Sequence, residues 1–521
     1  MSTSSAGGAR TRVAVGGLWA GLTWAVGIVT GPLLAIAIVR SMSHSQYGIL
    51  VVAASAVGLL TVVSGLGLQA AVSQIAAAER VENPAGGEVA TMKGAVTLGL
   101  RAALGGVVLA GAAALVFVVV RTLRPATVPL LALSPVVVVA PLAGVASGMY
   151  RVLHWPRKLA LRTMVSSVIL GVLIAVPLLF ARVTPLQISG ARALASVVAL
   201  ALLGIPLRGY YRGHAQRRVA AVPVKRIMPF ASALMLGVAF TAALAELDVF
   251  LLGVFRGARV TGLYAPGAAM AAVVAGLPTI VGSLYLPNAT DLAVRGELDQ
   301  LSALYRFATR WSITVAAPAL ALLLVSPAAV LSLVFGHGIE SMASTLRVLG
   351  FGAVVQIATG FNGITLDAFG LPRVVAVRQV ISLGVSFVAC LTLIPAFGPI
   401  GAAAATAIGY GAANVMCSTS LYRRFRLFPW DRAVLATSSA LAVAIGLSVV
   451  LDHFVEGSLY RCLVTAGLAG LLTSIAALVT GGRDERRAIA KGLRDKARRR
   501  APAQSAARMM PPTGRVSSEL S

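Results

Sequence analysis

Residues 33–78 read LLAIAIVRSMSHSQYGILVVAASAVGLLTVVSGLGLQAAVSQIAAA, and this stretch decides the fold class. One apolar run ends at Arg40, a short polar connection continues to Gln46, and a second apolar run begins at once. A helix needs about 20 apolar residues to cross the hydrocarbon core of a bilayer. With the apolar residues that precede residue 33, each run is long enough. The stretch therefore predicts a membrane-spanning helical hairpin.

The composition of the whole chain agrees with this interpretation. Of its 521 residues, 58% are hydrophobic and only 12% are charged, and the mean hydropathy is +0.88. A soluble domain carries about 25% charged residues, so these values exclude a soluble globular enzyme. The net charge of +27 would suggest nucleic-acid binding in a soluble protein. In a membrane protein, the positions of the cations decide what this charge means.

We predict an all-α polytopic membrane protein with about fourteen transmembrane helices, each found as an apolar run bounded by charged or turn residues. The runs lie near residues 13–39, 48–71, 95–120, 128–149, 159–180, 189–207, 227–255, 262–286, 311–335, 344–369, 377–396, 400–421, 433–451 and 462–480.

An internal repeat divides these helices into two groups. QYGILVVAASAVGLL, which begins at Gln46, aligns without gaps with LYAPGAAMAAVVAGL, which begins at Leu263, and the alignment pairs Tyr47 with Tyr264. SGARALASVVA from Ser189 and IGAAAATAIGY from Ile400 form a second pair. Transporters often carry such repeats, so we predict two six-helix bundles with two appended helices. At their outer positions, both tyrosines are interpreted as aromatic-belt anchors.

The repeat gives the following division of the chain. We predict a cytoplasmic N-terminus at 1–12, an N-terminal bundle at 13–207, a basic cytoplasmic linker at 208–226, a C-terminal bundle at 227–421, two additional transmembrane helices at 433–480, and a basic, disordered cytoplasmic tail at 481–521.

The cations predict how the chain is oriented in the cell (cytoplasmic) membrane. With both termini placed in the cytoplasm, about 35 of the 44 Lys and Arg residues fall on that side, as the positive-inside rule requires. The basic tail is expected to attract anionic membrane lipids, and no nucleic-acid partner is needed to explain the charge. The apolar part of the first span is longer than that of a signal sequence, so this span is expected to remain as an anchor.

The connections between the spans contain few residues that could form a catalytic site. The predicted outer loops are short and contain few acids, namely Glu340, Asp452 and Glu456. Cys390, Cys417 and Cys462 have no metal-type spacing. We therefore expect no catalytic residues, no metal and no cofactor, and a non-enzymatic protein.

Several motifs resemble those of Wzx-type polysaccharide flippases of the MOP (multidrug/oligosaccharidyl-lipid/polysaccharide) exporter superfamily. Beside residues 33–78 they are DVFLLGVFRGARVTGLYAPGAAM from Asp248, LYRFATRW from Leu304, FGHGIESMASTLRVLG from Phe335, LDAFGLPRVV from Leu366 and IPAFGPIGAAAATAIG from Ile394. The resemblance keeps the family's order from about residue 15 to 425. It implies a V-shaped pair of bundles around a central cavity, working by alternating access. Gln74, where many relatives have Arg, and Glu246, an additional acid, depart from the family pattern.

Two acids in the seventh span are candidates for binding a coupling ion, H⁺ or Na⁺. Asp248 fits the family pattern and is the first choice, with Glu246 as the second. Residues two apart point about 200° from one another on a helix, so both cannot face one cavity unless the helix is distorted. The alternative is that both lie near the outer headgroups and pair there with Arg256 and Arg259.

Arg40, Arg101 and Arg192 are the candidates for a cationic cavity that binds substrate, because Arg can bind phosphate oxygens bidentately. Snorkelling of these side chains to the headgroups is the alternative. Asn362 and Asp367 in the tenth span are secondary cavity candidates that could contact sugar hydroxyls or an ion. Asp367 lies near the cytoplasmic end and is more easily explained as interfacial.

The leading hypothesis is a flippase that moves a polyprenyl-diphosphate-linked oligosaccharide from the inner to the outer leaflet for cell-surface polysaccharide biosynthesis. A cation-coupled exporter of small amphiphilic drugs from the same superfamily is the alternative. A membrane polymerase or ligase of lipid-linked glycans and a lipid II flippase for peptidoglycan are favoured less.

Overall fold

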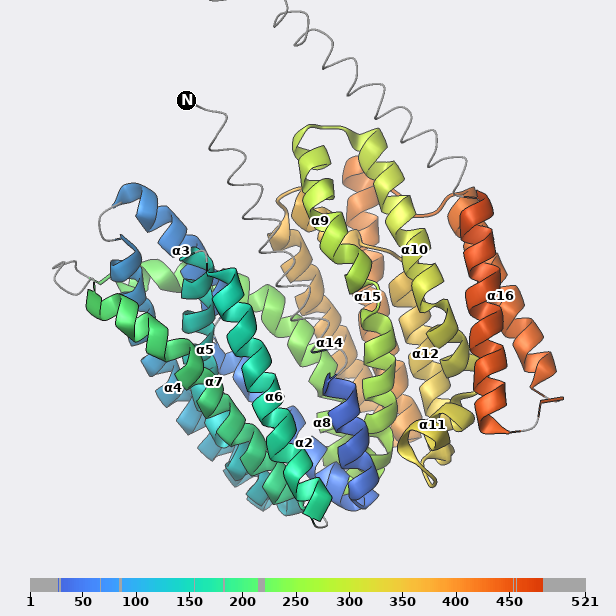
Figure 1. Cartoon of the computed structure of the whole chain (residues 1–521), viewed down its shortest axis with the longest axis horizontal. Coiled ribbons are helices and arrows are strands. Elements are labelled where there is room, and N and C mark those ends of the chain that lie inside the picture. Colours follow the sequence, from blue (N-terminus) through green and yellow to red (C-terminus); the bar gives the residue numbers. More distant parts are fainter. Residues whose placement is uncertain are drawn as a thin grey trace, which may run out of the picture.

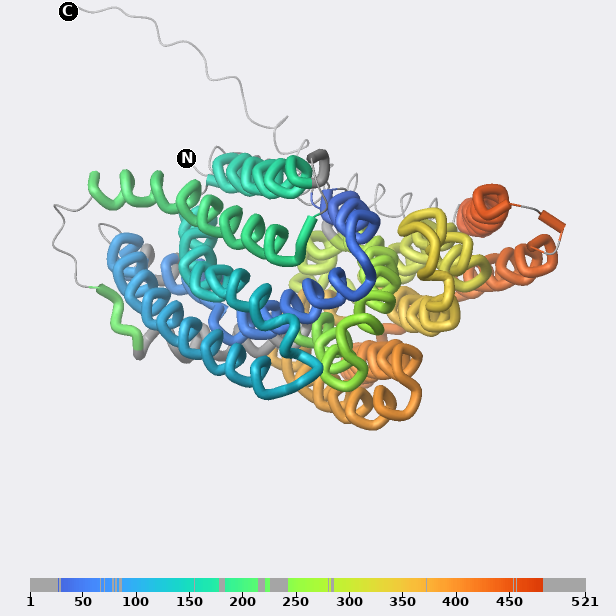
Figure 2. Tube along the Cα trace, turned by 90° about the horizontal axis from the view of Figure 1, so that it is seen from below, coloured from blue at the N-terminus to red at the C-terminus, as the bar shows by residue number. Residues whose placement is uncertain are grey.

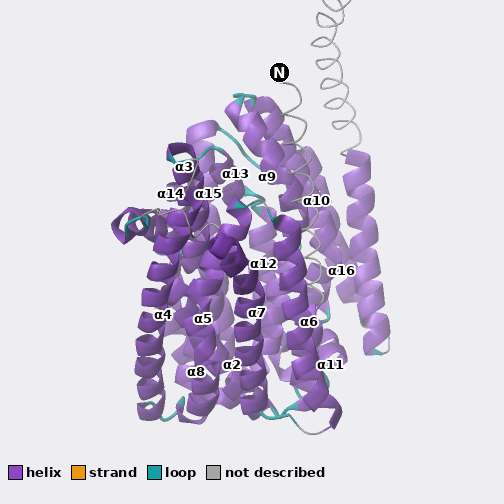
Figure 3. Ribbon diagram, turned by 60° about the vertical axis from the view of Figure 1, so that its left-hand side comes forward, coloured by secondary structure: helices purple, strands orange, loops and turns teal. Residues whose placement is uncertain are grey.

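The computed structural model describes residues 30–480 and Gly27, apart from residues 66, 84–86, 154, 181–182, 214–220, 453 and 456. Within this part of the chain every regular element is a helix and none is a strand, as Figure 3 shows. A backbone in lipid must satisfy its own hydrogen bonds, and a helix does so within one segment. The predicted all-α class is confirmed.

The first half of the chain forms the helix Thr30–Ser41, α2 (His44–Gly65), α3 (Leu68–Glu82), α4 (Gly87–Val119), the 3₁₀ turn η1 (Arg124–Ala126), α5 (Thr127–Val152), α6 (Pro156–Phe180) and α7 (Pro185–Gly213). The second half forms α8 (Val224–Gly276), α9 (Thr279–Val294), α10 (Leu298–Val325), α11 (Pro327–Phe335), η2 (Glu340–Met342), α12 (Ala343–Ala358), α13 (Asn362–Ala368), α14 (Pro372–Phe397), α15 (Pro399–Phe425), α16 (Arg432–Leu451) and the helix Ser458–Thr480.

Eleven helices of the described residues are long and apolar enough to cross a membrane, which makes this a multi-pass membrane protein. The count of fourteen stays a prediction. The predicted span near 13–39 begins outside the described residues. The spans near 227–255 and 262–286 meet within α8, whose 53 residues are broken at Gly257 (φ 78°, ψ 174°). A side chain at this positive φ would be strained, so glycine allows the chain to turn back there.

Two predicted spans differ from the helices that form. The ninth, placed near 311–335, corresponds to α10, which begins at Leu298, and to the separate short helix α11. The tenth, placed near 344–369, is broken into α12 and α13. Helices continue past the apolar core because polar side chains at their ends remain compatible with helical backbone, and hydropathy alone does not detect this.

The helices form two groups, with α3 to α7 on one side and α9 to α16 on the other (Figure 1). Each half has its own packing: α5 contacts α3, α4 and α7, and α14 contacts α15. The two halves meet along α8, which packs against α2 and also contacts α3. Figure 2, seen from below, shows the same separation of the blue-to-green and yellow-to-red helices.

The α2–α8 contact is closest where the start of α2 crosses the part of α8 that follows the break at Gly257. A Cβ atom on Gly48 would overlap the carbonyl group of Ala258, and one on Gly262 would overlap the carbonyl oxygen of His44. Small residues allow backbones in membranes to approach this closely. Nearby, Phe117 stacks on Phe250 with ring centroids 6.3 Å apart. The two halves are therefore joined at this end.

Candidate functional site

The candidate site lies where α2, α7 and α8 meet, and its central residue is Arg192 of α7. The guanidinium of Arg192 interacts electrostatically with the hydroxyl of Tyr47 on α2 and with the carboxyl of Glu246 on α8. Protein atoms surround Arg192 on most sides, yet its side chain keeps an exposed surface. This combination is expected of a charged group that lines an accessible space within a bundle.

Glu246 faces α2 across the seam between the two halves. A Cβ atom on Gly58 would lie 3.0 Å from the carboxyl carbon of Glu246, so the missing side chain at position 58 makes room for the acid. At 1.5 Å per residue, Glu246 lies about 16 Å from the break at Gly257, near the middle of the bilayer. Glu246 is half-buried.

Asp248 points the other way, into the second half. It is buried, with 4% of its surface exposed. Tyr264 donates to Asp248 Oδ2 at 2.5 Å, Thr406 donates to the same oxygen at 2.7 Å, and the backbone N–H of Val249 donates to Oδ1 at 2.7 Å. The two acids therefore diverge, as their spacing along the helix predicted. These hydrogen-bond partners of Asp248 are neutral.

The alternative, in which the acids pair with Arg256 and Arg259 at the outer headgroups, does not describe Asp248. Arg256 instead donates to the carbonyl oxygens of Ile394 (3.4 Å) and Pro395 (2.5 Å) at the end of α14. The carboxyl of Asp248 is satisfied inside the bundle by the hydroxyls of α8 and α15.

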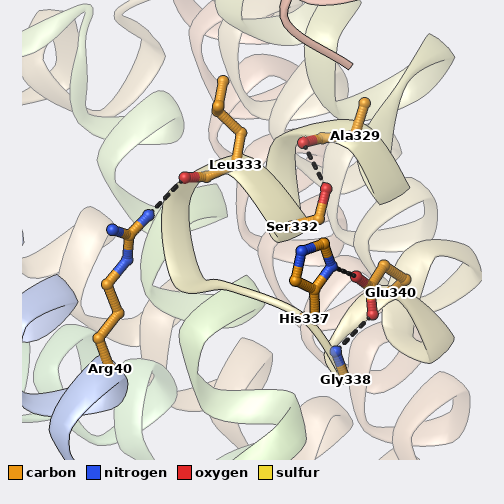
Figure 4. A network of polar contacts seen from close by, with 7 residues as sticks. All are labelled: Arg40, Ala329, Ser332, Leu333, His337, Gly338 and Glu340. Atoms are coloured by element: carbon orange, nitrogen blue, oxygen red, sulfur yellow. Dashed lines mark hydrogen bonds and ion pairs between the residues drawn. The ribbon is translucent and has the colours of Figure 1, made fainter. Parts of the chain in front are cut away.

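Arg40, a cavity candidate, forms a bridge between the halves (Figure 4). Figure 4 shows its hydrogen bond to the carbonyl oxygen of Leu333 (2.6 Å). Arg40 also donates to the carbonyl oxygen of Val334 (2.9 Å), and both carbonyls lie at the C-terminal end of α11. A cation is favourable there because the last carbonyls of a helix lack intrahelical partners and carry the negative end of its dipole. In this conformation Arg40 binds helix carbonyls from across the seam.

The same use of arginine recurs at the predicted outer ends of two more helices. Arg347 donates to the carbonyl oxygens of Leu324 and Val325 at the end of α10, as Arg256 does at the end of α14. Three of the few outer cations thus complete helix ends. Residue type alone could not separate these arginines from Arg192, which interacts with Tyr47 and Glu246 instead.

Arg101 does not join Arg192, and this part of the predicted cationic cavity needs correction. Arg101 is exposed on α4, and the side chains one and two turns further along the same face are Leu104 (69% exposed) and Val108 (72% exposed). A face of exposed apolar residues on a membrane helix is the face that meets lipid. Arg101 therefore lies on the outside of the bundle, where snorkelling accounts for it.

Asn362 and Asp367 lie apart from Arg192 as well. Asn362 is buried, and its amide donates to Asn414 Oδ1 at 3.1 Å and to Ser418 Oγ at 2.9 Å. These hydrogen bonds attach α13 to α15. Asp367 is exposed near the end of α13, in agreement with an interfacial position.

Tyr47, Tyr264 and Thr406 were not among the predicted site residues. The interpretation of the tyrosines as aromatic-belt anchors is wrong, because Tyr47 is 8% exposed and Tyr264 only 1%. Their side chains point between helices, toward Arg192 and Asp248 respectively. The internal repeat could have indicated these residues. The first pair of matched stretches contains Tyr47 and Tyr264, and the second pair, on α7 and α15, contains Arg192 and Thr406.

Metal ligands do not gather in this region. The described residues contain no group of three or more His, Cys, Asp and Glu placed to hold a metal ion. What the site offers is one accessible cation, one half-buried acid beside it, and a second acid enclosed by hydroxyls.

Comparison with solved structures establishes the fold. The lipid II flippase MurJ, in an inward closed conformation, superposes with a TM-score of 0.67 at 10% identity over 89% of this chain and 98% of that chain. An inward-facing multidrug resistance MATE family transporter of the MOP superfamily gives a TM-score of 0.56 at 13% identity over 77% of this chain and 94% of that chain. At such identities the likeness concerns the fold alone.

Sequence comparison adds the family. The probable low-salt glycan biosynthesis flippase Agl15 of Haloferax volcanii is 25% identical over 170 residues, 33% of this chain and 36% of that protein. The chain spans about half the length or less of the curated relatives it matches. A family model described as "Polysaccharide biosynthesis protein" matches residues 15–286, more than half of the chain. The chain therefore belongs to the polysaccharide biosynthesis protein family, and its resemblance to the Wzx-type flippases of the MOP superfamily is confirmed.

Proposed function

We propose that this protein is a flippase that moves a polyprenyl-diphosphate-linked oligosaccharide across the cytoplasmic membrane for cell-surface polysaccharide biosynthesis. The polyprenyl tail remains in the bilayer while the charged headgroup passes between the two halves. No covalent chemistry is required of the protein, so we propose a transporter and not an enzyme. The family match and the flippase among the relatives support this proposal.

The observation that carries the proposal is the placement of Arg192. It is an accessible guanidinium enclosed between the two halves, and Glu246 on the opposite helix interacts with it. A diphosphate is an anion that Arg binds with two parallel hydrogen bonds, and such bonds are strongest away from bulk water. When a diphosphate replaces Glu246 as the partner of Arg192, the electrostatic interaction across the seam is released.

The contacts at the outer end support alternating access. The Gly48–Gly262 crossing and the Arg40 bridge to α11 hold the halves together there, as does a hydrogen bond from Thr122 to the carbonyl oxygen of Val254 (2.8 Å). We therefore propose that the accessible side of Arg192 opens toward the cytoplasm in this conformation. Transport then requires these outer contacts to separate.

The experiment is transport in proteoliposomes that contain the purified full-length protein and a fluorescent polyprenyl-diphosphate oligosaccharide. Transfer between leaflets is followed by adding an impermeant quencher. We expect Arg192→Gln to slow transfer at least about tenfold, because a hydrogen bond to a charged group contributes roughly 1.5–3 kcal/mol.

Arg101→Gln is the matched control, since it removes the same charge from the lipid-facing side of the same half, and its transfer rate should stay within about twofold of the original. Correctly oriented protein that moves none of this lipid would overturn the proposal. Equal losses in both variants would remove Arg192 from the binding site.

A cation-coupled exporter of small amphiphilic molecules remains the second candidate, and the enclosed Asp248 favours it. A buried acid surrounded by the hydroxyls of Tyr264 and Thr406 offers oxygen atoms to H⁺ or Na⁺. The same proteoliposomes, loaded with ethidium under a pH or Na⁺ gradient, distinguish the two functions. Gradient-driven export of ethidium, without transfer of the lipid-linked oligosaccharide, would favour the exporter.

A further inference from the structure

A basic pocket lies between α14 and α15 at their predicted cytoplasmic ends, on helices that do not carry Arg192. Its volume is about 250 Å³, and it is lined by Arg378, Val415, Met416, Thr419, Ser420, Arg423 and Arg424. It is named here the α14–α15 pocket. The transport site described above does not use it.

The sequence brings these cations together because α14 and α15 run in opposite directions. Arg378 lies near the start of α14, and Arg423 and Arg424 lie in the last turn of α15. Arg378 Nε donates to Ser420 Oγ at 3.0 Å, which fixes its side chain against α15. Ser420 in turn donates to the carbonyl oxygen of Met416 at 2.7 Å.

The pocket has an excess of positive charge that its own residues do not balance. Within the described part of the chain, no carboxylate forms an ion pair with Arg378, Arg423 or Arg424. The dipole of α15 explains cations in its last turn, but it does not explain Arg378 on the neighbouring helix. Like charges held this close favour an anion between them.

An apolar strip leads from the pocket into the membrane. On α14, Ile381 and Val385 follow Arg378 by one and two turns and are 44% and 37% exposed. On α15, Val415 lines the pocket and Ile408 lies two turns before it on the same helix face, and they are 60% and 46% exposed. Figure 2 shows the orange helices of this region at the edge of the molecule. The strip therefore faces lipid, and the cations lie at its inner end.

We propose that the α14–α15 pocket binds the phosphate group of an anionic phospholipid of the cytoplasmic leaflet, with the acyl chains along the apolar strip. The guanidinium groups and the hydroxyl of Thr419 bind the phosphate oxygens. The volume is below the roughly 300–1,000 Å³ of pockets for drug-sized molecules, so the pocket suits a headgroup better than a small amphiphile. Basic pockets between helices on this side of a membrane bind such headgroups.

The test uses the full-length protein purified in a neutral detergent, with dioleoylphosphatidylglycerol as the probe and dioleoylphosphatidylcholine as the uncharged comparison. Bound lipid is counted by native mass spectrometry across a titration. We expect a clear preference for phosphatidylglycerol. The triple variant Arg378→Gln/Arg423→Gln/Arg424→Gln should weaken its binding about 100-fold, since each cation near an anionic lipid contributes a factor of about five.

Arg151→Gln/Arg208→Gln/Arg212→Gln is the matched control. It removes three exposed cations at the same predicted end of the first half, and the phosphatidylglycerol affinity should not change. The double variant Arg423→Gln/Arg424→Gln keeps Arg378, whose removal could disturb folding, and changes exposed side chains only. It should weaken phosphatidylglycerol binding about 25-fold.

Two results would overturn the proposal. Equal losses in both triple variants would mean that the lipid is attracted by overall charge. Displacement of phosphatidylglycerol by inorganic phosphate at an equal concentration would assign the pocket to a soluble anion.

Discussion

The two halves of the molecule hold repeat-related tyrosines in opposite surroundings. Tyr47 interacts with the accessible Arg192, whereas Tyr264 is fully buried and donates to the enclosed Asp248. The position of the tyrosine is kept, and its partner has changed from a cation on α7 to an acid on α8 itself. The comparison teaches that the two halves use the matched position differently: in the first half the tyrosine lies beside an accessible cation, and in the second it contacts an acid of α8 that Thr406 of α15 also contacts.

The strongest way to break this comparison is to remove Asp248. Asp248→Ala leaves the hydroxyls of Tyr264 and Thr406 and the N–H of Val249 without their acceptor. A buried unsatisfied polar group costs about 1–3 kcal/mol, so we expect the free energy of unfolding to fall by about 3 kcal/mol, after relaxation. The measurement is denaturant unfolding of the full-length protein in detergent. Glu246→Ala is the control, expected to change stability by less than about 1 kcal/mol. Similar losses in the two variants would contradict the division of roles.

The paired tyrosines sharpen the comparison directly. Tyr264→Phe removes one of the three donors to Asp248 and should lower the free energy of unfolding by about 1–3 kcal/mol, as expected when a buried acceptor loses a hydrogen-bond donor. Tyr47→Phe should cost less than about 0.5 kcal/mol, because Arg192 keeps access to water and to Glu246. The same unfolding measurement decides. A larger loss for Tyr47 would reverse the roles of the two halves.

A double-mutant cycle tests the electrostatic interaction between Arg192 and Glu246 across the seam. Arg192→Gln, Glu246→Gln and the double variant should give a coupling energy of about 0.5–1 kcal/mol in unfolding, reduced by the accessibility of Arg192. The cycle with Arg101 in place of Arg192 should give none, because Arg101 faces lipid. A coupling of zero in the first cycle would show that the two charges act independently.

The smallest expected effect concerns the Arg40 bridge. Arg40→Gln removes the hydrogen bonds to Leu333 and Val334, each worth roughly 1 kcal/mol or less at an exposed position. Amide hydrogen exchange should become up to about fivefold faster in α11 and at the outer end of α2. Arg347→Gln, the matched control, caps α10 within one half and should leave exchange in α2 unchanged. Faster exchange in α2 for both variants would show that the effect does not depend on the Arg40 contact between the halves.

Much of the fold could be predicted from the sequence because lipid imposes a simple rule. Apolar runs of helical length identified the multi-pass class, and the order of short motifs identified the superfamily. The break in α8 lies between two predicted spans, at Gly257, where the positive φ favours glycine. A break inside a span, such as that between α12 and α13, could not be predicted because the apolar pattern continues across it.

The site could be predicted only in part, and the arginines show why. Arg101 and Arg192 have the same chemistry and similar apolar neighbours in sequence, yet one faces lipid and the other the seam. That difference depends on how each helix is rotated against its neighbours, which sequence position alone does not determine. Likewise, Thr406 reaches Asp248 across 158 residues of sequence. The repeat could have indicated that α7 and α15 lie beside the paired tyrosines, but it does not show in which half the contact involves a charged residue.

While the outer contacts hold, the crossing at Gly48 and Gly262 is the point about which α2 and α8 can tilt against one another. Backbone rests on backbone there, so the crossing itself contains no side chain that would resist a change in the angle between α2 and α8. From this point to the end of α2 at Gly65 the lever is about 26 Å long, at 1.5 Å per residue. A tilt of about 10° would therefore displace the far end by about 4–5 Å. A slight rocking at the glycines would therefore move the far end of α2 by several ångströms relative to α8.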